Sequence, residues 1–145
     1  MADRVTDPQR ILFVCVHNSA RSQLAEGMLR AWGGNDFEVY SGGTETAAVK
    51  PEAVAVMAEL GIDISGHVSK TVERYLGQSW DALIPVCEEA CEACPYVPGA
   101  RRVERWSFDD PGAGLTDPGA RMADFRRVRD EIAAAVRDLI VRTNG

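Results

Sequence analysis

Continuous and alternating runs of apolar residues along the chain predict four β-strands. The predicted strands at 10–14 and 81–86 are apolar after their first residues, Arg10 and Asp81, which is typical of parallel strands that are covered on both faces. Apolar and polar residues alternate at 37–40, as expected for a strand. A fourth strand is predicted within 102–108. Each of these segments is followed by a polar or glycine-containing stretch, so the strands are predicted to be short and separate.

Apolar residues at helical spacing predict the helices between these strands. One helix is predicted at 19–32, and a second begins near Pro51 and stops before Gly61. A brief helix is predicted at 71–76. The last helix begins after Asp117, which is a suitable N-cap. A stripe of apolar residues along this helix is expected to face the core: Met122, Phe125, Val128, Ile132, Val136 and Leu139.

The alternation of strands and helices predicts an α/β fold with one four-stranded parallel sheet and helices on both faces. The 145 residues suit one domain that spans 1–145. In such sheets, ligands bind beyond the carboxyl ends of the strands. Cys15, Ser41 and Cys87 each follow a predicted strand, and Asp110 follows the fourth. We therefore expect a functional site at this edge of the sheet.

The stretch from Cys15 to Ser22 has the features of a site for a tetrahedral oxyanion. Five residues separate Cys15 from Arg21, which is enough for a tight loop whose amides point inward before a helix begins. Amides at a helix N-terminus bind anions, and a guanidinium binds two oxygens of one anion. The positive field of these amides and the guanidinium favours the thiolate form of Cys15, to which Ser22 can donate a hydrogen bond. The expected oxyanion-binding residues are Val16, His17, Asn18, Ser19, Ala20, Arg21 and Ser22.

Within this loop, Asn18 is expected to hold the backbone through its amide or to adopt a left-handed conformation, which Asn tolerates better than most residues. His17 is interpreted as a residue that shapes the loop. The alternative for the whole stretch is an ordinary buried Cys15 followed by a solvated Arg21. The predicted strand before Cys15, the predicted helix after it, and Ser22 next to Arg21 favour the oxyanion site.

Charge and composition limit the partners of this chain. Its formal net charge of -6 argues against nucleic acid or an anionic membrane as the main partner, and it requires local positive groups to attract an anionic substrate. The longest apolar run, 11–16, is too short to cross a bilayer, and residues 1–8 lack the apolar core of a signal peptide. We expect a monomeric cytoplasmic protein, in which four cysteines are catalytic, redox-active or metal-binding.

The spacing of Cys15, Arg21 and Ser22 resembles the phosphate-binding loop of low-molecular-weight protein tyrosine phosphatases. The longer string from Asn18 to Gly27 is more similar to the thioredoxin-coupled arsenate reductases of that fold. The resemblance covers most of the chain. It implies arsenate as the substrate and no tightly bound cofactor. It also implies that thioredoxin, or a glutaredoxin or low-molecular-weight thiol, is the electron donor.

A reductase must supply two electrons, and two thiols can supply them by forming a disulfide. The resemblance assigns this redox pair to Cys87 and Cys94, and it assigns the general acid to Asp110. It implies that Cys15 attacks arsenate while Asp110 protonates the departing oxygen. Cys87 then attacks the Cys15 sulfur and expels arsenite, and Cys94 attacks Cys87. Thioredoxin reduces the resulting Cys87–Cys94 disulfide.

Two assignments within this scheme have competitors in the sequence. Asp109 competes with Asp110, and either carboxylate could serve only to cap the turn before Pro111. Cys91 lies between the matched cysteines, and Cys91 with Cys94 has the spacing of a redox or zinc half-site. His17 and His67 do not supply the second half of a zinc site, so no metal is expected, and His67 is interpreted as a turn residue.

Some members of the resembled family bind potassium beside the loop. Asn18, Glu26 and Ser41 match that cation-site region, but Val68 and Lys70 stand at its last two positions. The Lys70 ammonium is expected where the cation would lie, so we predict little potassium dependence. The alternative is that Lys70 is simply exposed to solvent, as lysine commonly is.

Three functions are compatible with these sequence features. The leading interpretation is an arsenate reductase with weak phosphatase activity. The alternative enzyme is a phosphotyrosine or aryl phosphatase, because the same loop and acid would hydrolyse small aryl phosphates. The third is a non-catalytic redox sensor or anion-binding module, which would bind an oxyanion or be oxidised at Cys15 without multiple turnover.

Overall fold

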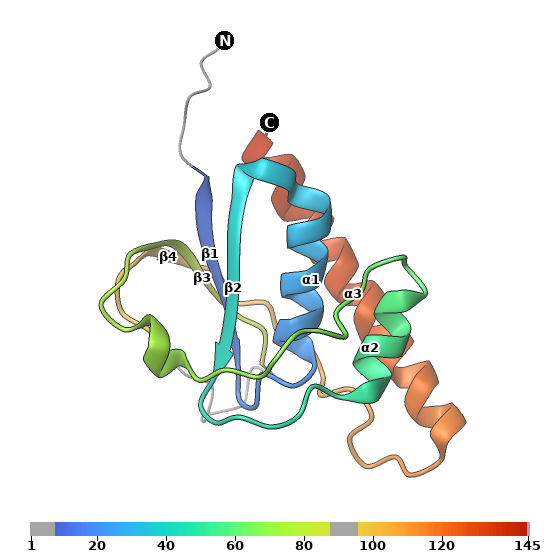
Figure 1. Cartoon of the computed structure of the whole chain (residues 1–145). Helices are drawn as coiled ribbons and strands as arrows, with labels where there is room; N and C mark the ends of the chain where they lie inside the picture. The colour runs from blue at the N-terminus through green and yellow to red at the C-terminus, as the bar shows by residue number, and fades with distance from the viewer. Residues whose placement is uncertain (1–7, 88–95, 145) are drawn as a thin grey trace.

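The computed structural model describes residues 8–87 and 96–144, and within them one parallel sheet carries the helices (Figure 1). Its four strands lie in the order β2-β1-β3-β4. All neighbouring pairs are parallel, as predicted. The predicted fold class is therefore confirmed. The strands are β1 (Gln9–Cys15), β2 (Phe37–Gly43), β3 (Trp80–Pro85) and β4 (Ala100–Val103).

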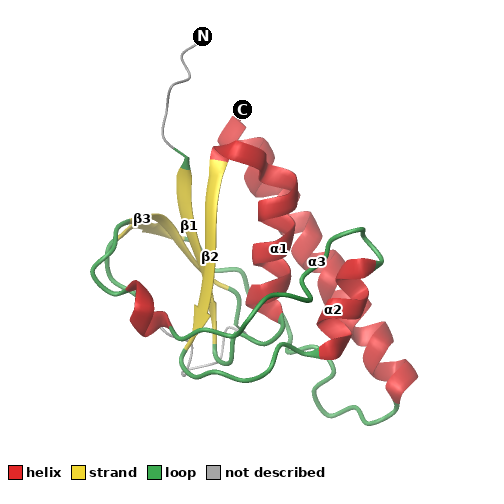
Figure 2. Ribbon diagram, in the orientation of Figure 1, coloured by secondary structure: helices red, strands yellow, loops and turns green. Residues whose placement is uncertain are grey.

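Three α-helices pack beside the sheet, as Figure 2 shows. They are α1 (Arg21–Gly33), α2 (Pro51–Ala58) and α3 (Pro118–Asn144). Two short 3-10 helices, η1 (Gly34–Asp36) and η2 (Val72–Tyr75), lie in the connections. In the part of the chain that the structure describes, no helix has both the length and the apolar character needed to cross a bilayer.

The two faces of the sheet are covered by different kinds of structure. Ile11 and Phe13 of β1 lie in the large core beneath the three α-helices, together with the predicted stripe of α3. Leu12 points to the other face, where it packs with Tyr75 of η2 and with Trp80. Neighbouring residues of a strand point to opposite faces, so β1 is apolar throughout because both faces are buried. Of the helices described, only the 3-10 helix η2 lies on the second face, together with Val97 from a loop, so the prediction of helices on both faces is wrong for the α-helices, which all pack on one face.

The fourth strand begins and ends earlier than the predicted 102–108. Only Ala100–Val103 is regular, and it is an exposed edge strand. The Trp106 backbone N–H still donates to the Pro85 carbonyl at 2.8 Å, but its ring turns inward and lies 5.5 Å from the Phe13 ring, centroid to centroid. This inward turn takes residues 106–110 out of the sheet and leads them to its carboxyl edge.

Two other boundaries differ from the predictions by a few residues. Strand β2 does not end at Tyr40, because its pairing with β1 continues until Gly43 lies opposite Cys15. Ser41 therefore lies within β2 and does not follow it. Helix α1 begins at Arg21 and not at Ser19, which leaves 16–20 free to form the loop. The predicted cap of α3 is confirmed, since the Asp117 carboxylate accepts a hydrogen bond from the N–H of residue 120 at 2.8 Å.

Candidate active site

A small pocket at the carboxyl edge of the sheet brings Cys15, Arg21 and Asp110 together. Cys15 is the last residue of β1, and Arg21 is the first residue of α1. The pocket has a volume of about 130 Å³ and is lined by Cys15, His17, Ser19, Ala20, Arg21, Lys50 and Asp110. Pockets for drug-sized ligands are several times larger. Its size and polar lining suit a small oxyanion.

The Cys15 sulfur has a hydrogen-bond partner, the Ser22 hydroxyl, that is able to donate to it. Cys15 is a free cysteine that is 3% exposed, and its Sγ lies 2.9 Å from the Ser22 Oγ. Ser22 Oγ also accepts a hydrogen bond of 2.7 Å from the Asn18 amide nitrogen. An amide nitrogen can only donate, so the hydroxyl hydrogen of Ser22 remains available to the sulfur. Ser22 can therefore stabilise a thiolate, as the sequence predicted.

Asn18 holds the loop in both of the ways that the sequence predicted. Its backbone is left-handed, with φ of 53°. The Lys70 backbone N–H donates to Asn18 Oδ1 at 2.8 Å. Because a backbone N–H is always a donor, this contact fixes the orientation of the Asn18 amide, and Nδ2 donates to Ser22 and to Ser41 at 2.9 Å. The loop is thereby tied to α1, to β2 and to the segment before η2.

Gly43 allows the loop to lie directly on the end of β2. A Cβ at this residue would lie 2.6 Å from the Val16 carbonyl oxygen and 2.9 Å from the Asn18 amide nitrogen. Real Cβ atoms do not approach backbone atoms this closely, so the position requires glycine. The sequence placed Gly43 at the end of a strand but offered no reason for it.

Gln23 is a second residue that holds Asn18 in place; it lies within the string from Asn18 to Gly27, but no role of its own was predicted from the sequence. Its side chain is fully buried and donates from Nε2 to Asn18 Oδ1 and to the Val68 carbonyl, both at 3.0 Å. Its Oε1 lies 2.9 Å from Nδ1 of His67. Burial lowers the pKa of His67, in agreement with a neutral ring that donates from Nδ1. His67 therefore supports the loop indirectly, by holding Gln23 in place, which is a role beyond that of a turn residue.

Arg21 and Asp110 meet at the pocket, and Asp109 does not. Arg21 is 8% exposed, donates to the Phe108 carbonyl at 3.1 Å, and lies 4.0 Å from an Asp110 oxygen. Asp109 points to α3, where it pairs with Arg127 at 3.3 Å. The turn after β4 thus places Asp110 among the pocket-lining residues. The Asp110 side chain is 47% exposed, so it is open to solvent as well as to the pocket.

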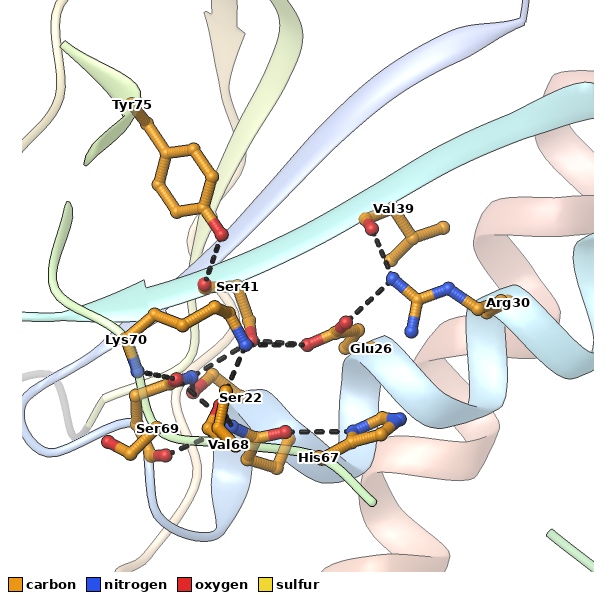
Figure 3. A network of polar contacts seen from close by, with 12 residues as sticks. Ser22, Glu26, Arg30, Val39, Ser41, His67, Val68, Ser69, Lys70 and Tyr75 are labelled. Atoms are coloured by element: carbon orange, nitrogen blue, oxygen red, sulfur yellow. Dashed lines mark hydrogen bonds and ion pairs between the residues drawn. The ribbon is translucent and has the colours of Figure 1, made fainter. Parts of the chain in front are cut away.

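The predicted cation-site region contains a buried carboxylate that already has cationic partners (Figure 3). Glu26 of α1 is 5% exposed, accepts a hydrogen bond from Ser41, and pairs with Arg30 at 2.6 Å. Burial alone would raise the pKa of Glu26, but Lys70, Ser41 and Arg30 more than offset burial and lower it. Glu26 therefore carries its charge at neutral pH.

Lys70 lies over Glu26 and is not freely exposed to solvent. Its side chain is 11% exposed, and its Nζ is 3.7 Å from Glu26 Oε1 and donates to the Val68 carbonyl at 2.9 Å. Burial lowers the pKa of Lys70, and Glu26 opposes that shift. The alternative of a solvent-exposed Lys70 is wrong. The residues present do not suit an additional cation, because an ammonium lies between the same oxygens.

Cys87 lies at the end of the strand that neighbours β1. It is fully buried, and its Sγ is 3.8 Å from the carbonyl oxygen of Val14, the residue before Cys15. It is disulfide-bonded, whereas Cys15 is free. The predictions for Cys91 and Cys94 fall outside the described residues. Among residues 8–87 and 96–144, no group of three or more His, Cys, Asp or Glu side chains is placed to hold a metal ion.

A free thiol at the end of a parallel strand, within an oxyanion-sized pocket, defines a class of small α/β enzymes that act through a cysteine nucleophile. This chain belongs to the low molecular weight phosphotyrosine protein phosphatase family, whose sequence pattern matches residues 10–144. The family resemblance expected from the Cys15 loop is thereby confirmed.

Relatives named arsenate reductase cover nearly the whole chain. Arsenate reductase 2 of Staphylococcus epidermidis is 39% identical over 136 residues, which are 94% of this chain and 99% of that protein. A solved arsenate reductase in a phosphate-binding state is 35% identical with a TM-score of 0.76, covering 92% of this chain and 98% of the other. A thioredoxin-dependent arsenate reductase from Corynebacterium glutamicum is 26% identical with a TM-score of 0.63, covering 93% and 61%.

Lys50 is a pocket residue that no sequence motif identified. It precedes α2 and lies in the connection that leaves the carboxyl end of β2. Since loops that follow parallel strands meet at one edge of the sheet, its place after a predicted strand was a signal for the site. His17, which also lines the pocket, pairs with Glu45 at 3.3 Å.

Proposed function

We propose that this protein reduces arsenate to arsenite by a thiol relay that begins at Cys15 and is recycled by a thioredoxin. The observation that carries the proposal is the free Cys15 in an oxyanion-sized pocket with a second cysteine, Cys87, at the end of the adjacent strand. A phosphatase needs only the first cysteine. Relatives named arsenate reductase, matched over nearly their whole length, support the same function.

The first step is a substitution at arsenic. The Cys15 thiolate attacks As(V), an S–As bond forms, an As–O bond breaks, and the oxygen leaves as water after Asp110 supplies a proton. No electrons change hands in this step. Arg21, already buried at the pocket, binds and orients the remaining oxygens.

The second step carries out the reduction. The Cys87 thiolate attacks the Cys15 sulfur, an S–S bond forms, and the As–S bond breaks with its electron pair left on arsenic, which departs as arsenite. The Cys94 thiolate then attacks Cys87 and releases Cys15. Thioredoxin, or a glutaredoxin or low-molecular-weight thiol, supplies the two electrons that reopen the Cys87–Cys94 disulfide. A free Cys15 beside a disulfide-bonded Cys87 is the distribution expected after these exchanges.

A second activity, hydrolysis of small aryl phosphates, is favoured by the family to which the chain belongs. The Cys15 loop, Arg21 and Asp110 would suffice for it, so we expect a weak phosphatase side activity. The relay requires reduced thiols and a disulfide reductase, and we accordingly assign the protein to the cytoplasm. We also propose that it acts as a monomer.

The test compares the two activities in cysteine variants. Arsenate turnover is followed with thioredoxin, thioredoxin reductase and NADPH, and phosphatase activity with p-nitrophenyl phosphate. Cys87→Ser and Cys94→Ser should abolish arsenate turnover and leave phosphatase activity, whereas Cys15→Ser should abolish both. Cys91→Ser is the matched control and should retain both. A wild-type protein that does not turn over arsenate would refute the proposal, and loss of both activities in Cys87→Ser would contradict a purely redox role.

A further inference from the structure

Lys50 places a second positive charge at the pocket, and the proposed relay does not use it. It lines the pocket together with Cys15, Arg21 and Asp110. Within the residues that the structure describes, its ammonium forms no hydrogen bond or ion pair, and the nearby carboxylate of Glu52 is already bound by another side chain, Arg121, at 2.8 Å. An ammonium that has no hydrogen bond or ion pair with the described part of the chain, and that acts on Glu52 only at longer range, is available to a ligand at the pocket.

The backbone of Lys50 is fixed between the oxyanion loop and α2. Its N–H donates to the Ser19 carbonyl at 2.9 Å, and its own carbonyl accepts from the Ala53 N–H at 3.0 Å. Pro51 follows at the first position of the helix. A side chain that starts from such a constrained backbone can place its charge reproducibly at the pocket.

The balance of charge at the pocket depends on Lys50. Asp110 lies 4.0 Å from Arg21, so these two charges largely offset each other when Asp110 is ionised. The ring of His17 lies 3.3 Å from the Glu45 carboxylate and is directed to that group. When Cys15 is a thiolate and Asp110 is ionised, Lys50 is therefore the group that keeps the pocket from carrying a net negative charge, in a chain whose formal net charge is -6.

Building on the proposed function, we infer that Lys50 is a substrate-binding residue that makes the pocket selective for small inorganic oxyanions over aryl phosphomonoesters. An inorganic oxyanion presents a fourth oxygen to the pocket mouth, where the ammonium can bind it. An aryl ester presents a ring there instead, and no lining residue is Phe, Tyr, Trp or a large aliphatic. The ring would remove water from Lys50 and Asp110 without replacing the lost hydrogen bonds.

The test measures binding in a Cys15→Ser background, where neither ligand can be turned over. Inorganic phosphate and phenyl phosphate are titrated separately by calorimetry. Lys50→Met should lower the affinity for inorganic phosphate about tenfold, as expected for a lost hydrogen bond to a charged group. The affinity for phenyl phosphate should fall about threefold or less, because the thioether of the introduced methionine contacts the phenyl ring. Lys50→Arg should keep the preference for inorganic phosphate.

The matched control is Arg101→Met, which removes the same charge from an 82% exposed side chain on β4. It should change either affinity by less than about twofold, since Arg101 does not line the pocket and an exposed charge is screened by water and salt. The inference would be overturned if Lys50→Met lowered the affinities for both ligands equally, or lowered neither. A folded Lys50→Arg that has lost the preference for inorganic phosphate would also overturn it. These titrations do not require arsenate reduction, so failure of the proposed activity is recognised separately.

Discussion

Replacing Asn18 by alanine tests whether one buried amide holds the oxyanion loop. Asn18 is fully buried, and its side chain bonds to Ser22, Ser41, Gln23 and the Lys70 backbone. Four lost hydrogen bonds at about 1 kcal/mol each give a loss of about 4 kcal/mol. Alanine in the left-handed conformation adds about 1 kcal/mol.

Some of the released groups retain other partners, which lowers this total. Gln23 still donates to Val68, and Ser41 still donates to Glu26. We therefore expect Asn18→Ala to reduce the free energy of unfolding by about 3–5 kcal/mol. Urea unfolding followed by tryptophan fluorescence measures this loss, provided that the m-value is unchanged.

Two further variants separate the causes. Asn18→Gly loses the same hydrogen bonds but adopts a positive φ freely, so its loss should be about 1 kcal/mol smaller than that of alanine. Asn18→Asp keeps the shape but offers only acceptors to Ser22, which must then turn its hydrogen away from the Cys15 sulfur. We expect the kcat of Asn18→Asp for arsenate reduction to fall about tenfold or more, with little change in the KM for arsenate. A loss below about 1 kcal/mol in Asn18→Ala would refute the reasoning.

Two further predictions concern charged groups away from the pocket. In the wild type, exchange of potassium for choline at equal ionic strength should shift the melting temperature by less than about 2 °C. Lys70→Met should be destabilised and partly rescued by potassium, because Glu26 stays buried with one cation fewer. A larger potassium shift in the wild type would contradict this. Hydrogen bonds from Arg126 and Arg129 lower the pKa of Glu59 to about 2 from an ordinary 4.5. The unfolded chain therefore binds the proton first, and the stability that Glu59 contributes above pH 4.5 is lost as the pH falls towards 2. Urea unfolding should show Glu59→Gln less stable than the wild type at pH 6 and equal to it near pH 2, and the same difference at both values would count against the argument.

Sequence patterns predicted the parts of the fold that depend on neighbouring residues. The apolar run that ends at Cys15 predicted β1, and the loop and helix that follow were predicted from adjacent residues. The cap at Asp117 is also a local contact, made with a residue three positions further on. Local chemistry of this kind can be recognised without knowing the fold.

The features that were missed depend on contacts between distant segments. The end of β4 is set by Trp106, which leaves the sheet to pack on Phe13. Asp109 and Asp110 are neighbours in the sequence, and it is their distant partners, Arg127 for Asp109 and Arg21 for Asp110, that distinguish them. Lys50 belongs to the site because the connection after β2 folds back onto the loop through Ser19. No propensity or spacing within a short window contains this information.

Pairing of the acidic side chains explains how a chain with net charge -6 can offer an anion site. Near the loop, Glu26 is held by Arg30 and Lys70, and Glu45 faces His17. Acids that are already paired repel an approaching anion much less than free ones, and the remaining field of the protein is screened beyond about 8 Å at physiological ionic strength. If the pocket binds an oxyanion as proposed, we therefore expect capture to be decided within the last few ångströms, by the amides of the loop, Arg21 and Lys50. The sign of the net charge then affects the rate of encounter more than the affinity of the pocket.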